Sequence, residues 1–154
     1  MCRQSTEDLR DLYRNLILDH AREPRHFGKL DQPTHEARGV NRLCGDKLRI
    51  YLRVEDGAVS DVSFDGVGCA ITIASASLLT QVLKGMSTQD ALAFSDRLMQ
   101  RLTAGQNDDS NFDPGALRAL EGVREYPARV KCATLPWQTL KSAIEGNEAT
   151  ASTE

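Results

Sequence analysis

The stretch that decides the fold is KLRIYLRVEDGAVSDVSFDGVG, residues 47–68. Polar and apolar side chains alternate on both sides of its central EDGA segment, residues 55–58. Alternation with a period of two is typical of β-strands that bury one face, and an Asp-Gly pair favours a tight hairpin turn. The stretch therefore predicts two antiparallel strands joined by a hairpin.

The pattern becomes helical immediately after the second strand. AITIASASLLTQVLKG, residues 70–85, carries small side chains that suit close packing, and it ends at a glycine. Helices and loops alternate from there to the C-terminus. The sequence predicts helices over residues 70–84, 87–104, 115–125 and about 132–144, a polar loop, QNDDSNFDPG, at 106–115, and a flexible tail at 146–154.

A further helix is expected on the N-terminal side. STEDLRDLYRNLILDHAREP, residues 5–24, has apolar side chains at helical spacing, acids in its first turn and a proline at its end. We interpret His20, near that end, as a packing residue or a partner contact. A loop rich in Pro, Gly and His follows, and ARGVNRL, residues 37–43, predicts a third strand.

The composition is that of a single domain. The chain has 154 residues, 40% of them hydrophobic, which suits one core; we expect residues 1–154 to form one domain, ordered over about 5–145. The net charge is −3 and the pI is about 5.6. Because there is no long basic tract, no signal-like segment and no apolar run that could span a bilayer, we predict a cytoplasmic protein that binds neither nucleic acid nor membrane.

Three of the four cysteines lie where predicted elements join. Cys44 precedes the first strand of the hairpin, Cys69 follows the second, and Cys132 is expected to begin the last helix. If these ends meet at one edge of the sheet, the thiols converge. Helix N-termini favour thiolates, so the pKa values of Cys69 and Cys132 are expected to be low, and Arg129 and Lys131 add positive charge near Cys132.

Converging thiols in a cytosolic chain favour metal binding over disulfides. Three thiolates leave zinc one ligand short of four, and Asp46, two residues beyond Cys44, can supply the fourth. The spacing alone is weak evidence, since the chain has no CxxC pair. Three unrelated buried cysteines remain the alternative, because free cysteine is often buried. Trp137 and Leu135 are interpreted as core residues.

The local sequences resemble a known family. LYRNLILDHAREPRHFGKL, the stretch from CGDK at 44–47 through GCAITIASASLLT at 68–80, and VKCATLPWQTLKSAI at 130–144 are similar to the SufU/IscU/NifU N-terminal family of iron–sulfur biogenesis proteins. The resemblance extends from about Leu9 to Ile144. It implies an α+β fold, with a small three-stranded antiparallel sheet, helices packed on one face and a metal site at one exposed end.

Within that family, the chain resembles the SufU-type branch. Scaffold-type IscU members carry histidine before the third cysteine and an LPPVK motif upstream, whereas this chain has Lys131 and YPARVK. SufU-type members also carry an insertion between the second and third cysteines. The long interval between Cys69 and Cys132 fits that pattern.

The resemblance implies a zinc-dependent sulfurtransferase. By motif matching, Cys44, Asp46, Cys69 and Cys132 would hold Zn²⁺. A pyridoxal phosphate (PLP)-dependent cysteine desulfurase of the SufS type would be the persulfide donor, and its histidine would replace Cys44 on the zinc. Cys44 would then accept the sulfur for downstream Suf-type assembly proteins, and Arg129 would have a supporting role.

Two alternatives stay open. The chain could be a scaffold on which iron or an iron–sulfur cluster is assembled, or a module in which zinc only supports folding.

Overall fold

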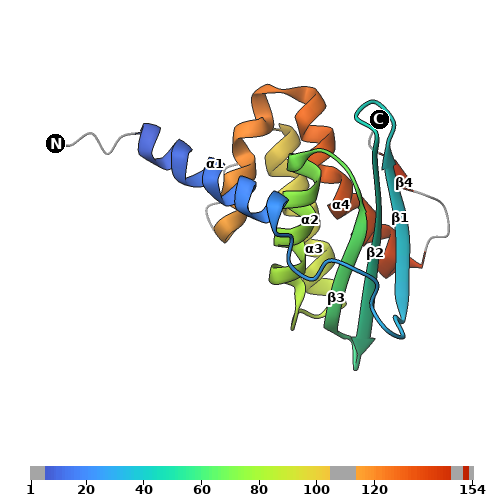
Figure 1. Ribbon diagram of the computed structural model, residues 1–154. Coiled ribbons are helices and arrows are strands. Elements are labelled where there is room, and N and C mark those ends of the chain that lie inside the picture. The colour runs from blue at the N-terminus through green and yellow to red at the C-terminus, as the bar shows by residue number, and fades with distance from the viewer. Residues whose placement is uncertain (1–5, 105–113, 147–150, 153–154) are drawn as a thin grey trace.

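The computed structural model describes residues 6–104, 114–146 and 151–152, the side chains of 6–12, 104, 125 and 151 excepted. The elements are α1 (Thr6–Arg22), β1 (His35–Asn41), β2 (Asp46–Glu55), β3 (Ala58–Val67), α2 (Ala70–Leu83), α3 (Thr88–Ala104), the 3₁₀ helix η1 (Gly115–Glu125), α4 (Pro127–Glu145) and β4 (Ala151–Ser152). From α1 to α4, helices and strands follow one another in the predicted order, and a short strand that was not predicted, β4, comes after them (Figure 1).

The sheet confirms the predicted antiparallel strands. Its order is β3-β2-β1-β4, and β2 pairs antiparallel with both β1 and β3. Leu48, Ile50 and Leu52 alternate along β2 and are buried. At the hairpin, Asp56 and Gly57 have φ values of 52° and 77°, the positive angles that match a two-residue turn to the twist of the strands.

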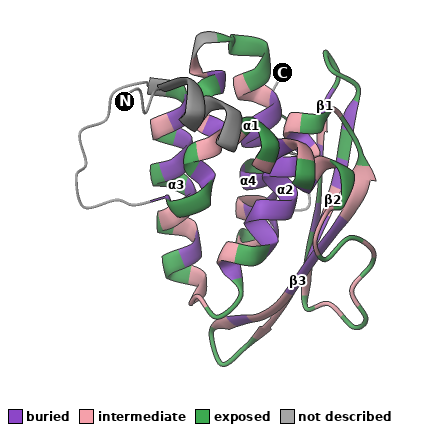
Figure 2. Cartoon of the chain, turned by 60° about the vertical axis from the view of Figure 1, so that its left-hand side comes forward, coloured by how far each residue is buried: buried purple, intermediate pink, exposed green. Residues whose placement is uncertain are grey.

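The helices lie on one face of the sheet, as the resemblance implied (Figures 1 and 2). α2 and α4 contact the strands, and α1, α3 and η1 pack around these two helices. Trp137 and Leu135 of α4 are fully buried, which confirms them as core residues. The Trp137 indole N–H donates to Ser75 Oγ at 3.1 Å, and Ser75 donates to the Ala133 carbonyl at 2.7 Å, so α2 and α4 are joined by polar bonds inside the core.

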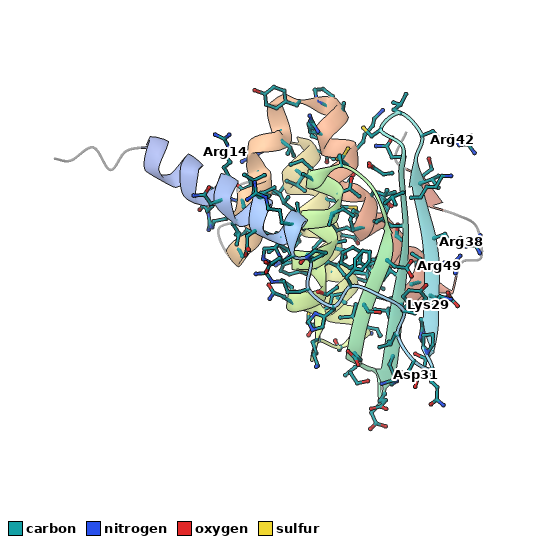
Figure 3. The ribbon with its side chains drawn as sticks, in the orientation of Figure 1. Arg14, Lys29, Asp31, Arg38, Arg42 and Arg49 are labelled. Atoms are coloured by element: carbon teal, nitrogen blue, oxygen red, sulfur yellow. The ribbon has the colours of Figure 1, made fainter. Side chains whose placement is uncertain are left out.

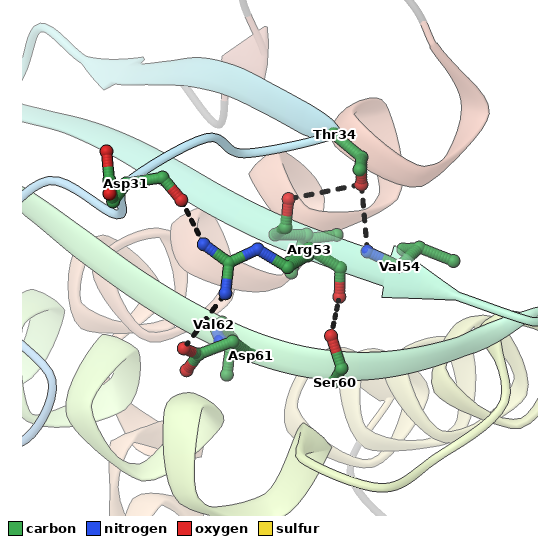
Figure 4. A network of polar contacts seen from close by, with 8 residues as sticks. Asp31, Thr34, Arg53, Val54, Ser60, Asp61 and Val62 are labelled. Atoms are coloured by element: carbon green, nitrogen blue, oxygen red, sulfur yellow. Dashed lines mark hydrogen bonds and ion pairs between the residues drawn. The ribbon is translucent and has the colours of Figure 1, made fainter.

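The loop between α1 and β1 is fastened to the sheet. The Gly28 N–H donates to the Phe64 carbonyl at 2.7 Å, on the outer edge of the edge strand β3. Farther along, Arg53 of β2 donates to the Asp31 carbonyl (Figure 4). The Thr34 N–H donates to the Leu52 carbonyl at 2.8 Å. The loop therefore crosses from β3 to the far end of β1 along a defined path.

The expected start of the last helix was wrong. α4 begins at Pro127, five residues before Cys132, and Tyr126 is its N-cap. Proline is well placed at the first helical position, because its fixed φ suits a helix and its missing N–H would have no helical partner there. Cys132 therefore lies in the second turn and not at the N-terminus. Pro136 also lies within α4, so the Cys132 carbonyl lacks the amide donor that a helix normally supplies four residues later.

Two predicted segments fall mostly outside the described residues. These are the polar loop at 106–115, of which only Pro114 and Gly115 are described, and most of the tail. Within the tail, Ala151 and Ser152 form β4 and pair in parallel with Gly39 and Val40 of β1. In the part of the chain that is described, no helix has the length and apolarity needed to cross a membrane.

His20 is a packing residue at the end of α1, as expected. It is 3% exposed, and its Nδ1 lies 2.7 Å from Ser77 Oγ. Ser77 Oγ also accepts the Arg25 N–H at 2.8 Å, which leaves its own proton to donate to Nδ1. Burial, and then the nearby Arg25 charge, hold the pKa of His20 below its ordinary 6.5, against the opposing effect of Asp19.

This lowered pKa predicts an acid-side loss of stability. The unfolded chain takes up the proton first as pH falls, so the contribution of His20 is complete above the ordinary pKa and is lost as pH falls through the folded-state value. We expect the free energy of unfolding, measured by urea titration from about pH 8 to pH 5, to decrease more steeply in the wild type than in His20→Gln. Equal slopes in the two proteins would contradict this.

Candidate metal centre

The site lies at the end of the sheet that carries the turn between β1 and β2. Arg42, labelled in Figure 3, marks this turn. Asn41 and Asp46 pair across it as the last residue of β1 and the first of β2. Gly45 has φ = 73°, in the left-handed region that glycine adopts readily. The turn leaves Cys44 exposed, while Asp46 is 1% exposed at the start of β2.

Asp46 connects the sheet to the start of α2. Its Oδ1 accepts the Cys69 N–H at 2.9 Å, and its Oδ2 accepts the Thr72 hydroxyl at 2.8 Å. Cys69 is the N-cap of α2, so its predicted place at a helix start is confirmed. Gly68 makes this approach possible, because a Cβ there would lie 2.8 Å from Asp46 Oδ1 and 3.2 Å from the Thr72 Cβ.

The Cys132 thiol reaches the same place from α4. Its Sγ lies 3.3 Å from Cys44 Sγ, across 88 residues of chain. Cys44, Asp46 and Cys132 each offer a ligand atom within 4.8 Å of the other two. Cys69 is outside that mutual group, but its backbone N–H donates to Asp46 Oδ1, and its thiol is near enough to influence the pKa of Cys132. Three of the four side chains therefore meet, and Cys69 lies beside them.

The two helix cysteines differ in acidity. Burial by itself raises the pKa of the Cys69 thiol, but hydrogen bonds from Thr72 and Cys132 outweigh it, and the pKa lies below its ordinary value. The pKa of Cys132 is raised strongly, first by burial and then by hydrogen bonding to Cys44, Cys69 and Asp46. The expectation of a low pKa at Cys132 was wrong, because the helix N-terminus lies a turn and a half away.

Two contacts of the site were missed in the sequence. The Thr72 hydroxyl lies 3.4 Å from Cys69 Sγ while it donates to Asp46. Its place three residues after an N-cap is a position that often bonds to the cap, so the sequence did contain this signal. The buried Asn41 places its Nδ2 3.9 Å from Cys132 Sγ. Its Oδ1 is buried without a hydrogen-bond partner in the described part of the structure.

The other candidates lie apart from the sulfur atoms. Arg129 is exposed on the first turn of α4, and no contact with the cysteines is found for it among the described residues. His26 lies 3.0 Å from Thr80 Oγ1 and His35 lies 2.8 Å from Thr34 Oγ1, so neither histidine belongs to the group.

Comparison with known proteins identifies the family of the chain. The sequence model of the NifU-like N-terminal domain matches residues 12–145. The chain belongs to this NifU-like family. The match begins within α1 and ends with α4, so all four proposed ligand residues lie within the family domain.

The relatives of this NifU-like domain include both a sulfurtransferase and scaffold proteins. The chain is 38% identical to the zinc-dependent sulfurtransferase SufU of Bacillus subtilis, over 92% of this chain and 95% of that protein. It is 39% identical to the iron–sulfur cluster assembly scaffold protein IscU of Thermotoga maritima, over 87% and 93%. The crystal structure of FiSufU of Fervidobacterium islandicum, which is named an iron–sulfur cluster assembly scaffold protein for the SUF system, superposes with a TM-score of 0.77 at 31% identity, covering 84% of this chain and 93% of that one.

Proposed function

We propose that this protein is a zinc-dependent sulfurtransferase, which accepts persulfide sulfur from a cysteine desulfurase for iron–sulfur cluster assembly. One observation carries the proposal. Cys44 is exposed to solvent while its sulfur lies 3.3 Å from the buried Cys132 thiol. A sulfur acceptor must be reachable by a partner protein and also belong to the site that activates it, and Cys44 meets both conditions.

The proposed zinc ligands are Cys44, Asp46, Cys69 and Cys132. Three thiols and one carboxylate make up the four donors that zinc takes in proteins. Burial beside Cys69 and Asp46 raises the pKa of Cys132, and a dication among these groups would remove that penalty. Each Asp46 oxygen already accepts one hydrogen bond, but a carboxylate oxygen has a second lone pair available for a metal.

The chemistry of transfer belongs to Cys44. Bound zinc would keep the thiols deprotonated and has no redox chemistry of its own. The Cys44 thiolate attacks the outer sulfur of the partner's cysteine persulfide, the sulfur–sulfur bond of the partner breaks, and the partner's cysteine leaves as a thiolate. Cys44 then carries the persulfide. The exchange conserves electrons, so no outside oxidant or reductant is needed.

The surroundings support an anionic donor. The exposed Arg129 provides positive charge on the first turn of α4, so we retain it as a supporting residue. We propose a PLP-dependent cysteine desulfurase of the SufS type as donor, downstream Suf-type assembly proteins as recipients, and the cytoplasm as the place of action. The zinc-dependent name of the Bacillus subtilis relative supports this assignment.

Scaffold activity is the second candidate. The similarity to the Thermotoga maritima scaffold protein favours it, and the same four side chains could hold iron or a cluster. The candidates differ in what the protein carries afterwards: a persulfide on one cysteine, or an assembled cluster.

The deciding experiment combines metal analysis with a desulfurase assay. The protein is purified anaerobically, its metal is measured, and cysteine turnover by the desulfurase is followed with and without it. Sulfur transfer predicts one zinc per chain, strong stimulation, and a mass increase of one sulfur atom on the Cys44 peptide. A visible cluster that passes to an apo-protein would replace this proposal with the scaffold. Unfolding on chelation without any effect on the desulfurase would indicate a structural zinc.

Thr72 offers a test of how the ligands are held. Thr72→Val keeps the shape but removes the hydroxyl that donates to Asp46 and lies beside Cys69. We expect zinc affinity to fall roughly 10-fold to 100-fold, as is common when a hydrogen-bond partner of a metal ligand is lost. The measurement is competition with a chromophoric chelator. Thr139→Val is the matched control, because that buried hydroxyl donates only to the Leu135 carbonyl within α4. Equal affinities in the two variants would contradict the role of Thr72.

A further inference from the structure

A groove runs between α1 and η1 and ends beside the site. Its volume is about 480 Å³. Ile17 of α1 and Val123 of η1 are buried apolar residues that line it. Tyr126, at the junction of η1 and α4, is 59% exposed, so a large aromatic ring is left open to solvent at its edge. Exposed apolar surface of this kind marks sites of interaction.

Only two of the described side chains that line the groove are charged, and both are cations. Arg14 projects from α1 (Figure 3), and Arg129 lies on the first turn of α4. Both are exposed, and among the described residues neither forms an ion pair with a carboxylate. In a chain of net charge −3, an apolar groove flanked by two exposed arginines, neither of which has a carboxylate partner in the described part of the structure, favours an occupant that carries both apolar and acidic side chains.

Some residues that line the groove are close neighbours, in the sequence, of the cysteines at the site. Ala70 and Ile71, which line it, directly follow Cys69. Arg129 also lines it, three residues before Cys132. A protein that brings a persulfide to Cys44 must cover this end of the molecule, so the groove lies beside the area that the partner occupies.

We infer that this groove receives a segment of the cysteine desulfurase in which an apolar side chain stands beside an acidic one. The inference rests on the proposed function and extends it, because it assigns the docking contacts to residues outside the ligand set. Apolar contact with Tyr126 contributes affinity, and the arginines contribute orientation and rate of association. Docking at the groove is thereby separate from chemistry at Cys44.

The test measures binding of the purified desulfurase to the zinc-loaded protein by isothermal titration calorimetry. We expect Arg14→Glu and Tyr126→Ser each to raise the dissociation constant about 10-fold or more. Zinc content and the stimulated turnover at saturating protein should stay unchanged, because neither residue touches the sulfur site. Arg22→Glu is the matched control, since Arg22 is also exposed on α1 but does not line the groove. It should bind as the wild type does.

The outcomes separate this inference from the function on which it rests. If the wild type accepts sulfur and both groove variants bind as tightly as it does, the groove inference is overturned and the sulfurtransferase stands. If the wild type neither binds nor stimulates the desulfurase, both proposals fail. A dimer of this chain that Tyr126→Ser dissociates, or a carboxylate-bearing lipid seen in the groove by native mass spectrometry, would assign it a different occupant and overturn the inference.

Discussion

Cys44→Ala is expected to reduce stimulation of the desulfurase by at least about 100-fold, because it removes the atom that accepts sulfur. The fold should survive, since Cys44 is exposed in a turn. Zinc should still bind, more weakly, because three donors remain and water can take the fourth position, as it does in catalytic zinc sites. Turnover with saturating protein and the zinc content per chain measure the two effects separately.

The control is Cys2→Ala, which removes a thiol that is not among the proposed ligands. It should behave as the wild type does in both assays. Substantial stimulation by zinc-loaded Cys44→Ala would contradict the assignment of Cys44 as acceptor. Cys69, the more acidic of the two helix thiols, would then be the next candidate.

Cys132→Ala is expected to have the larger effect on the metal. The Cys132 sulfur lies 3.3 Å from Cys44 Sγ and within 4.8 Å of an Asp46 oxygen, and it is the buried thiol of that group. Losing it removes this enclosed donor. We expect zinc affinity to fall by more than about 100-fold, beyond the loss typical of a supporting residue. Because alanine is small and apolar, the buried position should tolerate it.

Equilibrium dialysis against a buffered zinc series measures this affinity, and circular dichroism of the metal-free proteins checks the fold. Cys44→Ala serves as the comparison, since it removes an exposed donor at the edge of the group. If Cys132→Ala kept zinc as tightly as Cys44→Ala does, the centre of the site would lie elsewhere, and the proposed ligand set would need revision.

The strands and most helix positions were predictable because their signals are local. Polar and apolar side chains alternate along β2 and β3, and the Asp56-Gly57 turn joins the two strands. Each of these signals involves only residues that are neighbours in the sequence. The start of α4 was misjudged because proline both interrupts helices and begins them, and nearby sequence does not separate these uses. The structure places Pro127 at the beginning. The same shift moved Cys132 from a helix end into the core.

At the site, three of the four side chains chosen from the sequence lie together in the structure, but the sequence did not indicate how they differ. Cys44, Asp46, Cys69 and Cys132 were chosen from their places at element joints and from the family resemblance. The roles of Asn41 and Thr72 were missed, because a hydrogen bond to a sulfur or a carboxylate depends on where another element packs. Thr72 bonds to a residue 26 positions earlier, and Asn41 lies beside one 91 positions later.

By itself, the sequence determined the hairpin, the order of elements and the family, since each follows from short-range periodicity or from local motifs. Only the tertiary structure decided which thiol faces solvent and which is enclosed. Packing of α4 against β1 buries Cys132. The turn after Asn41 places Cys44 at the surface, with its Sγ 3.3 Å from Cys132 Sγ. The physical reason is that burial, and with it the pKa of each thiol, depends on neighbours that are distant in the chain.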